Sequence, residues 1–295
     1  MRVRGSGEQW YGYHASYTAN CQSFAGFAVL ASQPDPLYPT LPSQNLPVLF
    51  YYDEAFIMNI DLVLERIHTY QPPEGWGGHI FLLPEPVMRD IYQLVLDEKL
   101  TQCLELGTGF GATSCAICAA LDEMGEGQLT TIDKYFHQPV NVQVLMQHIG
   151  LDLKYLNIVA DELGYNWHMA ELLKQQLENP KTVSLFDFCL LDGAHEWEPD
   201  ALAFNLVNPL LKPSAWMLVD DLDFKLRMIP NWQESHGNYS DRELDTFQMR
   251  MVYDLVVKQH PDYEAFDVTH NGRIGWARKK VTEKNVSLLQ KLLGG

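Results

Sequence analysis

The sequence has no long apolar run and little positive charge. No uninterrupted apolar stretch reaches the length of a membrane span, and the first residues lack the apolar core of a signal peptide. Only 21 Lys and Arg stand against 38 Asp and Glu, which gives a net charge of −17. Because such a surface repels phosphate backbones, we expect neither a nucleic-acid nor a membrane partner. A cytoplasmic protein is predicted.

Cysteine is also scarce, with five in 295 residues. Cys115 and Cys118 form a C-x-x-C string, but it falls within a predicted helix, and no second pair completes a zinc site. The cysteines lie mostly in apolar contexts, so we interpret them as reduced residues of the core, as in a reducing compartment.

The chain divides by pattern into three segments. Residues 1–83 are rich in aromatic residues and proline, with one amphipathic helix at 53–69. We expect them to form a cap that packs on the main domain, lines a substrate pocket or makes a homo-oligomer contact. Residues 84–280 alternate helices with strands, and residues 281–295 are predicted to form a helical tail.

The alternation predicts the fold. Five strands separated by helices imply a parallel sheet with right-handed crossovers. Two further strands around Asn271 and Gly272 indicate an antiparallel hairpin. The expected fold is therefore α/β, a doubly wound, mostly parallel seven-stranded sheet with a C-terminal antiparallel hairpin. The predicted strands are 102–106, 128–132, 155–160, 186–191, 215–219, 263–269 and 273–278.

Three alternating glycines follow the first strand, in the string TQCLELGTGFGA. Gly107, Gly109 and Gly111 allow close backbone approach to a ligand, and the next helix opens with unpaired amides. Glu105 at the strand end favours a cofactor with an amine or sulfonium and ribose hydroxyls over a pyrophosphate. The string also satisfies the looser G-x-G-x-x-G/A fingerprint, so an NAD-dependent oxidoreductase stays open.

Acids stand at or beside the ends of all five parallel strands. Ligands of such sheets bind beyond these ends. Asp133 is placed to bind ribose hydroxyls, and Asp161, with Glu162 as a rival, to accept from an adenine amino group. The strand-end acids are Glu105, Asp133, Asp161, Asp192 and the pair Asp220-Asp221.

The acids of the fourth and fifth strands predict a metal site. Asp192, Asp220 and Asp221 follow neighbouring parallel strands, so they can converge into the oxygen-rich site that Mg²⁺ prefers. His195 stands three residues after Asp192. It is interpreted either as a catalytic base beside this site or as a loop histidine that caps the next helix or bonds to Asp192.

Together these features resemble the class I S-adenosylmethionine-dependent methyltransferases. Glu105-x-Gly107-x-Gly109-x-Gly111 is similar to their cofactor motif, and the terminal hairpin is typical of their sheet. Asp192-Gly193-Ala194-His195 with the later Asp220-Asp221 resembles the catechol O-methyltransferase group and, more closely, the cephalosporin-hydroxylase and macrolide-sugar methyltransferase group. Lys212-Pro213-Ser214-Ala215 departs from the Gly-Gly turn usual there.

The resemblance implies a ligand set and an activity. S-adenosylmethionine would be held by Glu105, Gly107, Thr108, Gly109, Gly111, Asp133 and Asp161. A divalent cation such as Mg²⁺ would be held by Asp192, Asp220 and Asp221, with His195 and Asp192 as catalytic residues. The predicted activity is methyl transfer to a hydroxyl of a small molecule, namely a natural product, sugar or phenol, with His195 as general base.

Four alternatives remain. They are a metal-independent N-methyltransferase, a non-methylating, hydroxylase-like enzyme, the NAD-dependent oxidoreductase, and a binding module without turnover. The segment 222–240 is predicted either to form a lid over the acceptor, through Phe224, Trp232, His236 and Tyr239, or to be a surface loop that packs on the cap.

Overall fold

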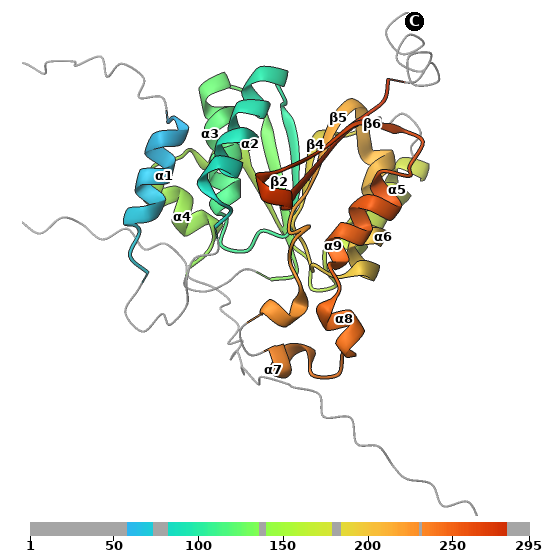
Figure 1. Ribbon diagram of the computed structural model, residues 1–295. Helices are drawn as coiled ribbons and strands as arrows, with labels where there is room; N and C mark the ends of the chain where they lie inside the picture. Colours follow the sequence, from blue (N-terminus) through green and yellow to red (C-terminus); the bar gives the residue numbers. More distant parts are fainter. Residues whose placement is uncertain (1–57, 73–81, 136–139, 179–183, 230–231, 282–295) are drawn as a thin grey trace, which may run out of the picture. The chain divides into compact units, whose positions relative to one another are not determined.

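The computed structural model describes residues 58–72, 82–135, 140–178, 184–229 and 232–281 (Figure 1). The chain divides into two compact units, Met1–Tyr52 and Asp53–Gly295, and every described residue belongs to the second. Most of the predicted cap and nearly all of the predicted tail therefore lie outside the described residues. Within the described ranges, no helix has the length and apolar character needed to cross a bilayer.

Seven strands of the described chain form one sheet in the order β3-β2-β1-β4-β5-β7-β6. The first five run parallel to one another, and β7 pairs antiparallel with both β5 and β6. This arrangement confirms the predicted doubly wound sheet and its terminal hairpin. The strands are β1 Gln102–Leu106, β2 Gln128–Asp133, β3 Leu156–Ala160, β4 Phe186–Leu191, β5 Leu211–Val219, β6 Tyr263–Thr269 and β7 Ile274–Lys279.

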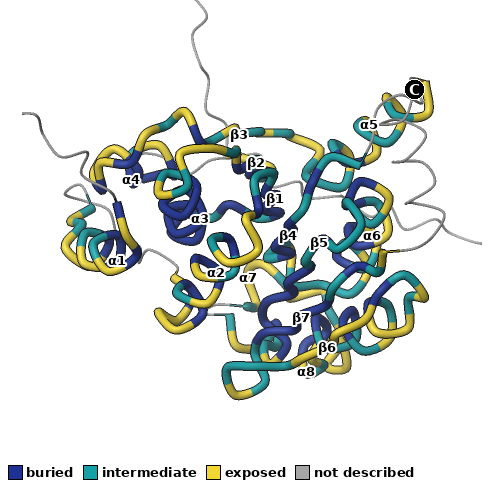
Figure 2. The backbone as a smooth tube through the Cα atoms, turned by 90° about the horizontal axis from the view of Figure 1, so that it is seen from above, coloured by how far each residue is buried: buried dark blue, intermediate teal, exposed yellow. Residues whose placement is uncertain are grey.

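Helices cover both faces of the sheet, as the views in Figures 1 and 2 show. Successive residues of a strand point to opposite faces, so Cys103 packs into one hydrophobic cluster and Leu104 into the other. One face carries α1 Ile60–Thr69, α2 Glu85–Glu98, α3 Ala112–Met124 and α4 Val142–Ile149. The other carries α5 Tyr165–Glu178, α6 Trp197–Val207, α9 Gln248–Met251 and the π-helical turn Val252–Val257.

Helix α3 lies at the centre of the first layer. Its residues from Ala112 to Leu121 are all buried, which small side chains permit. Cys115 and Cys118 lie in this stretch with free thiols, and burial raises the pKa of both well above the usual value. The C-x-x-C string is therefore part of the core.

Helix α1 is the described helix of the predicted cap. It buries Val63, Leu64 and Ile67 in the same hydrophobic cluster as α3 and α4. Its N-cap is Asn59, whose side chain accepts a hydrogen bond from the amide of Leu62 at 3.1 Å. This part of the N-terminal segment thus belongs to the core of the main domain.

The chain between the fifth strand and the hairpin does not form one long helix over 241–260, although apolar periodicity there predicts one. A capping box at Ser240 starts α8 Asp241–Asp245, and extended backbone at Thr246 ends it after five residues. Gln248 bridges the break, because its side chain donates to the carbonyl of Glu243 and accepts from the amide of Trp197. Shorter elements complete the chain: α7 Trp232–His236 and the 3₁₀ turns Leu153–Tyr155, Asn208–Leu210, Leu226–Met228 and His270–Gly272.

Candidate active site

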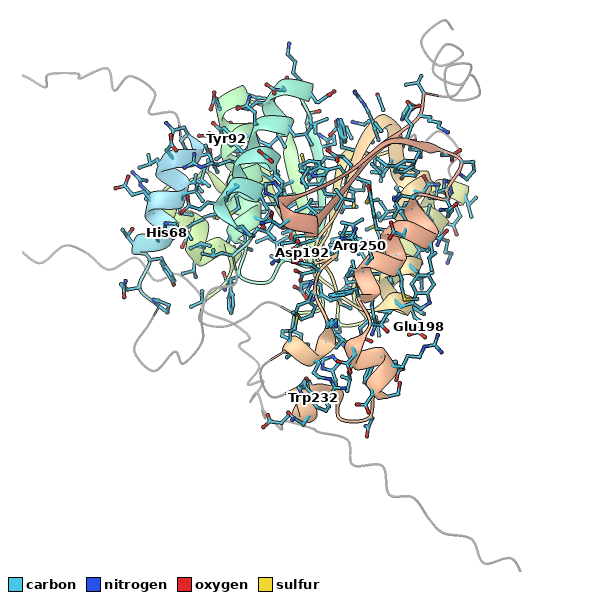
Figure 3. The ribbon with its side chains drawn as sticks, in the orientation of Figure 1. His68, Tyr92, Asp192, Glu198, Trp232 and Arg250 are labelled. Carbon is cyan, nitrogen blue, oxygen red and sulfur yellow. The ribbon has the colours of Figure 1, made fainter. Side chains whose placement is uncertain are left out.

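A cavity of about 790 Å³ lies beyond the carboxyl ends of the parallel strands. The glycine turn after β1 forms one part of its wall, and the loops after β4 and β5 form another. Asp192, the residue after β4, lies between the two layers of helices in Figure 3. Predicted site residues on the wall are Glu105, Gly107, Thr108, Gly109, Asp133, Asp192, His195, Asp220 and Asp221.

The glycine turn is built for close approach. Gly107 has a φ of 95°, and a Cβ added there would lie 1.8 Å from the carbonyl oxygen of Asp192. The turns after β1 and β4 therefore meet only because position 107 has no side chain. Gly111 starts α3 without a side-chain cap, and Ala112 and Thr113 of its first turn line the cavity. Backbone amides at a helix start are donors for a ligand.

Glu105 is buried beneath this turn, with 1% of its surface exposed. Its Oε2 accepts hydrogen bonds from Ser114 Oγ and, at 2.6 Å, from Thr131 Oγ1. Burial raises the pKa of Glu105 to about 8, although these two hydrogen bonds oppose the shift. A cation in the cavity would favour the ionised carboxylate.

Asp133 fixes the glycine turn from the end of β2. Its Oδ2 accepts from the amides of Thr108 at 3.0 Å and Gly109 at 3.2 Å, and its Oδ1 accepts from Lys134 at 2.7 Å. An ionised carboxylate has about four acceptor positions. Three are used here, which leaves room for one further donor such as a ribose hydroxyl.

Two of the predicted cofactor residues, Gly111 and Asp161, do not line the cavity. Asp161 Oδ1 accepts from the amide of Leu163 at 2.9 Å, and its Oδ2 lies 3.7 Å from Nδ1 of His168. The wall after β3 is formed instead by residues from Leu163 to Asn166, where α5 begins. Sequence reasoning missed these residues because it looked for an acid rather than for the helix start.

Asp192, His195 and Asp221 form one compact group. The imidazole Nε2 of His195 lies 3.1 Å from Asp192 Oδ1 and 3.2 Å from Asp221 Oδ2. One ligand atom from each residue lies within 4.8 Å of the others, so the three can hold a metal ion. Burial lowers the pKa of His195, but the hydrogen bond to Asp192 and the charges of both carboxylates outweigh it and raise the pKa to about 9.

Asp220 is not one of the three residues of this group, although it lines the same cavity, so the metal set of Asp192, Asp220 and Asp221 stays a prediction. Its carboxylate pairs with Arg273, the residue before β7, and is 1% exposed. Burial and the charges of Asp192 and Asp221 raise the pKa of Asp220 to about 7, although Arg273 opposes this. The sequence analysis did not predict Arg273 as a site residue. The one feature that could have indicated it is its position directly after the Asn271-Gly272 turn of the hairpin.

The segment 222–240 contributes one of its four aromatic residues to the cavity wall. The ring of Phe224 packs edge-on against His195, with centroids 5.5 Å apart. Trp232 instead stacks on Arg227, and Tyr239 donates to Glu196 Oε2 at 2.5 Å. His236 packs against the ring of Tyr239. These contacts tie the segment to its own surroundings and to the loop after β4.

The sheet order, the glycine turn and the strand-end acids define a class I S-adenosylmethionine-dependent methyltransferase domain. Residues 104–222 match the family model described as a methyltransferase domain; the match begins within β1, ends after β5 and includes the glycine turn and the acids that follow β4 and β5. This match assigns residues 104–222 to a methyltransferase domain. Comparison with curated protein sequences gives no match.

Solved structures with a similar chain path include a protein of Corynebacterium glutamicum, 12% identical over 76% of this chain and 91% of that chain, with a TM-score of 0.53. A putative O-methyltransferase from Klebsiella pneumoniae is 18% identical over 75% and 90% of the two chains, with a TM-score of 0.48. TomG, an O-methyltransferase from Streptomyces achromogenes solved with S-adenosylmethionine, is 17% identical over 79% and 93%, with a TM-score of 0.47. The first of these likenesses shows a shared fold.

Proposed function

We propose that the protein is a cytoplasmic O-methyltransferase that methylates a hydroxyl of a small natural product, sugar or phenol. One observation carries this proposal. A single cavity has the glycine turn on one part of its wall and the Asp192, His195 and Asp221 group on another. A methyl donor on the turn and a hydroxyl at this group would therefore face each other.

The wall fits S-adenosylmethionine. The space beside Gly107 and Gly109, the open amides at the start of α3 and the free acceptor position of Asp133 suit the methionine and ribose parts. When bound, S-adenosylmethionine supplies an electrophilic methyl group on a sulfonium. Glu105 and the backbone of the turn would orient it, while Asp133 would accept from the ribose.

His195 is the proposed general base, a role that requires its neutral imidazole; because its pKa is raised to about 9, this form increases as the pH rises toward 9. Transfer forms a bond between the acceptor oxygen and the methyl carbon, breaks the carbon–sulfur bond, and moves the hydroxyl proton to the imidazole. Nε2 is hydrogen-bonded to Asp192, and the carboxylate of Asp221 lies 3.2 Å from it, so both negative charges stabilise the imidazolium that results. Phe224 packs on the ring and limits its rotation.

The donor set also fits a divalent cation, held by Asp192 and Asp221. When bound, such an ion would lower the pKa of the acceptor hydroxyl. If His195 stays outside the ligand set, the oxygen donors suit Mg²⁺; with His195 included, the mixed set also suits Mn²⁺ or Fe²⁺. Asp220 would act indirectly, by holding Arg273.

The acceptor part of the wall is apolar and acidic. Phe224, Met228 and Ile229 line it, with Leu82 and Leu83 from the N-terminal segment. We infer that the acceptor is an uncharged molecule with an apolar body, and that residues 1–83 contribute to its pocket and to any homo-oligomer contact. The guanidinium of Arg273 is already engaged by two carboxylates, which disfavours an anionic acceptor.

A second candidate is metal-independent transfer, including transfer to nitrogen. Arg273 and a protonated His195 supply two positive charges against the three carboxylates of Asp192, Asp220 and Asp221. This balance reduces the repulsion that would otherwise require a cation.

Product mass and S-adenosylhomocysteine release test the proposal. The purified full chain is incubated with S-adenosylmethionine and a panel of uncharged phenols, sugars and macrolides, with Mg²⁺ or with a chelator. We expect an acceptor to gain CH₂ on oxygen, and His195→Ala to retain cofactor binding while losing turnover. Full turnover of His195→Ala with an unchanged pH profile would exclude the general-base role, and activity in chelator would favour the second candidate.

A further inference from the structure

A buried pair lies directly behind the loop that carries His195. Tyr165, the first residue of α5, donates from Oη to Asp200 Oδ1 at 2.5 Å. Asp200, in the first turn of α6, is completely buried, and Tyr165 also touches the cavity. Burial raises the pKa of Tyr165, so the hydroxyl keeps the proton that it donates.

This pair holds the backbone on both sides of His195. The amide of Ala194 donates to Tyr165 Oη at 3.1 Å, and the amide of Glu196 donates to Asp200 Oδ2 at 3.1 Å. The two amides that flank His195 are thus bound to two side chains that are bound to each other. Neither side chain comes from the loop itself.

The residue between these amides has an unusual backbone. His195 has a φ of 60°, a left-handed conformation that residues with a Cβ adopt only when their surroundings enforce it. In this conformation the imidazole lies between Asp192 and Asp221. A relaxed backbone would turn the side chain elsewhere.

The loop also fits the pair closely at Gly193. A Cβ added there would lie 2.5 Å from Tyr165 Oη and 2.8 Å from Asp200 Oδ1. The hydrogen bonds to Ala194 and Glu196 can form only because position 193 has no side chain.

We propose that Tyr165 and Asp200 are positioning residues, which hold the 193–196 loop in the strained conformation that places His195 between Asp192 and Asp221. The role of His195 in catalysis rests on the proposed function, but the positioning does not. A helix-capping role for Asp200 alone would predict a loss of stability without a specific effect on His195.

Amide hydrogen exchange in the full, isotope-labelled chain tests this directly. In Tyr165→Phe and Asp200→Asn, we expect exchange at Ala194 and Glu196 to become at least about tenfold faster. Tyr253→Phe is the matched control. It also removes a buried hydroxyl, one that lies within hydrogen-bond distance of the backbone carbonyls of Asp267 in β6 and Trp276 in β7, far from the loop in sequence. Equal exchange at Ala194 and Glu196 in all variants and the wild type would overturn the proposal.

A second readout reports on the imidazole. The rings of His195 and Phe224 are close enough for a nuclear Overhauser effect between them. We expect this signal to persist in Tyr253→Phe and to be lost in Tyr165→Phe and in Asp200→Asn. Gly193→Ala should lose it too, although that variant keeps every hydrogen-bonding group of the pair. A signal retained in all three loop variants would refute positioning.

Neither readout needs an acceptor or methyl transfer. If His195→Ala remains fully active while Tyr165→Phe shows fast exchange and no ring signal, the proposed function fails and the positioning stands. If His195→Ala is inactive but the loop amides are unaffected in Tyr165→Phe, the positioning fails and the proposed function stands.

Discussion

Arg273 binds Asp220 through two parallel hydrogen bonds, Nε to Oδ1 at 3.0 Å and Nη2 to Oδ2 at 3.1 Å. The same Nη2 lies 2.6 Å from Asp221 Oδ1. One guanidinium from the terminal hairpin therefore joins both carboxylates that follow β5. Because Asp220 is almost fully buried, its charge depends on this partner.

Arg273→Gln should destabilise the fold above pH 7, where Asp220 is ionised, by up to about 3–5 kcal/mol, the cost of leaving a buried charge unpaired. The difference in free energy of unfolding between the wild type and Arg273→Gln should shrink as the pH falls below 7, because protonated Asp220 needs no cation. Urea denaturation at pH 5 and pH 7.5 measures this. The double variant Arg273→Gln with Asp220→Asn is the control and should recover part of the loss; no recovery would mean that Arg273 acts through other contacts.

Metal affinity should depend on Asp192 and Asp221 more than on Asp220. Asp192→Asn and Asp221→Asn should each weaken Mn²⁺ binding by about tenfold or more, because each removes a charged donor of the compact group. Asp220→Asn should change it far less, since that carboxylate faces Arg273. Electron paramagnetic resonance of free Mn²⁺ measures all three. A loss of Mn²⁺ affinity at Asp220 equal to the others would support the metal set of Asp192, Asp220 and Asp221.

Asp133→Ala should weaken S-adenosylmethionine binding, measured by calorimetry. The variant loses a ribose acceptor and also releases the amides of Thr108 and Gly109. We therefore expect the affinity for S-adenosylmethionine to fall by about tenfold or more. Asp133→Asn keeps one acceptor oxygen for the amides and separates the two effects. Unchanged affinity in the alanine variant would remove Asp133 from the cofactor site.

Glu105 should make stability depend on pH. Its pKa is raised to about 8 from an ordinary 4.5, so the folded chain holds this proton more tightly than the unfolded chain. The stabilisation is complete below about pH 4.5 and is lost as the pH rises through 8. Glu105→Gln cannot lose a proton. Between pH 5 and 8, its free energy of unfolding should therefore rise relative to that of the wild type by an amount on the order of 3 kcal/mol. Parallel denaturation curves would contradict the raised pKa.

Ser214→Gly should stabilise the chain relative to Ser214→Ala by about 1 kcal/mol, measured by urea denaturation. Ser214 has a φ of 63° and lies in β5, in the stretch where the pairing with β4 shifts register. Both variants lose the hydroxyl that bonds to the Pro213 carbonyl, so their difference isolates the Cβ strain. Equal stability would mean that neighbouring strands relax this irregular stretch.

The fold was predictable because its signals are local. Apolar runs, glycine turns and the Asn271-Gly272 dipeptide each specify structure within a few residues, and all seven strands follow from them. The break at Thr246 was not predictable from helical periodicity, because the capping box at Ser240 and the bridging side chain of Gln248 decide it.

The site was predictable only in part. Position at a strand end placed Asp133, Asp192 and Asp221 on the cavity wall, because parallel strands end at one edge. It did not separate Asp220 from Asp221, adjacent residues whose side chains have different partners. Contacts between distant segments, such as Tyr165 with Asp200, leave no local pattern in the sequence.

The strand order has a consequence for how the enzyme is made. Because β7 lies between β5 and β6, β5 acquires its second neighbour only from the last described strand. A chain cut after α9 would keep the glycine turn and all the acids, but it would expose the edge of β5 and leave Asp220 without a counter-charge. During synthesis, the cavity can therefore take its final form only after the hairpin has emerged from the ribosome.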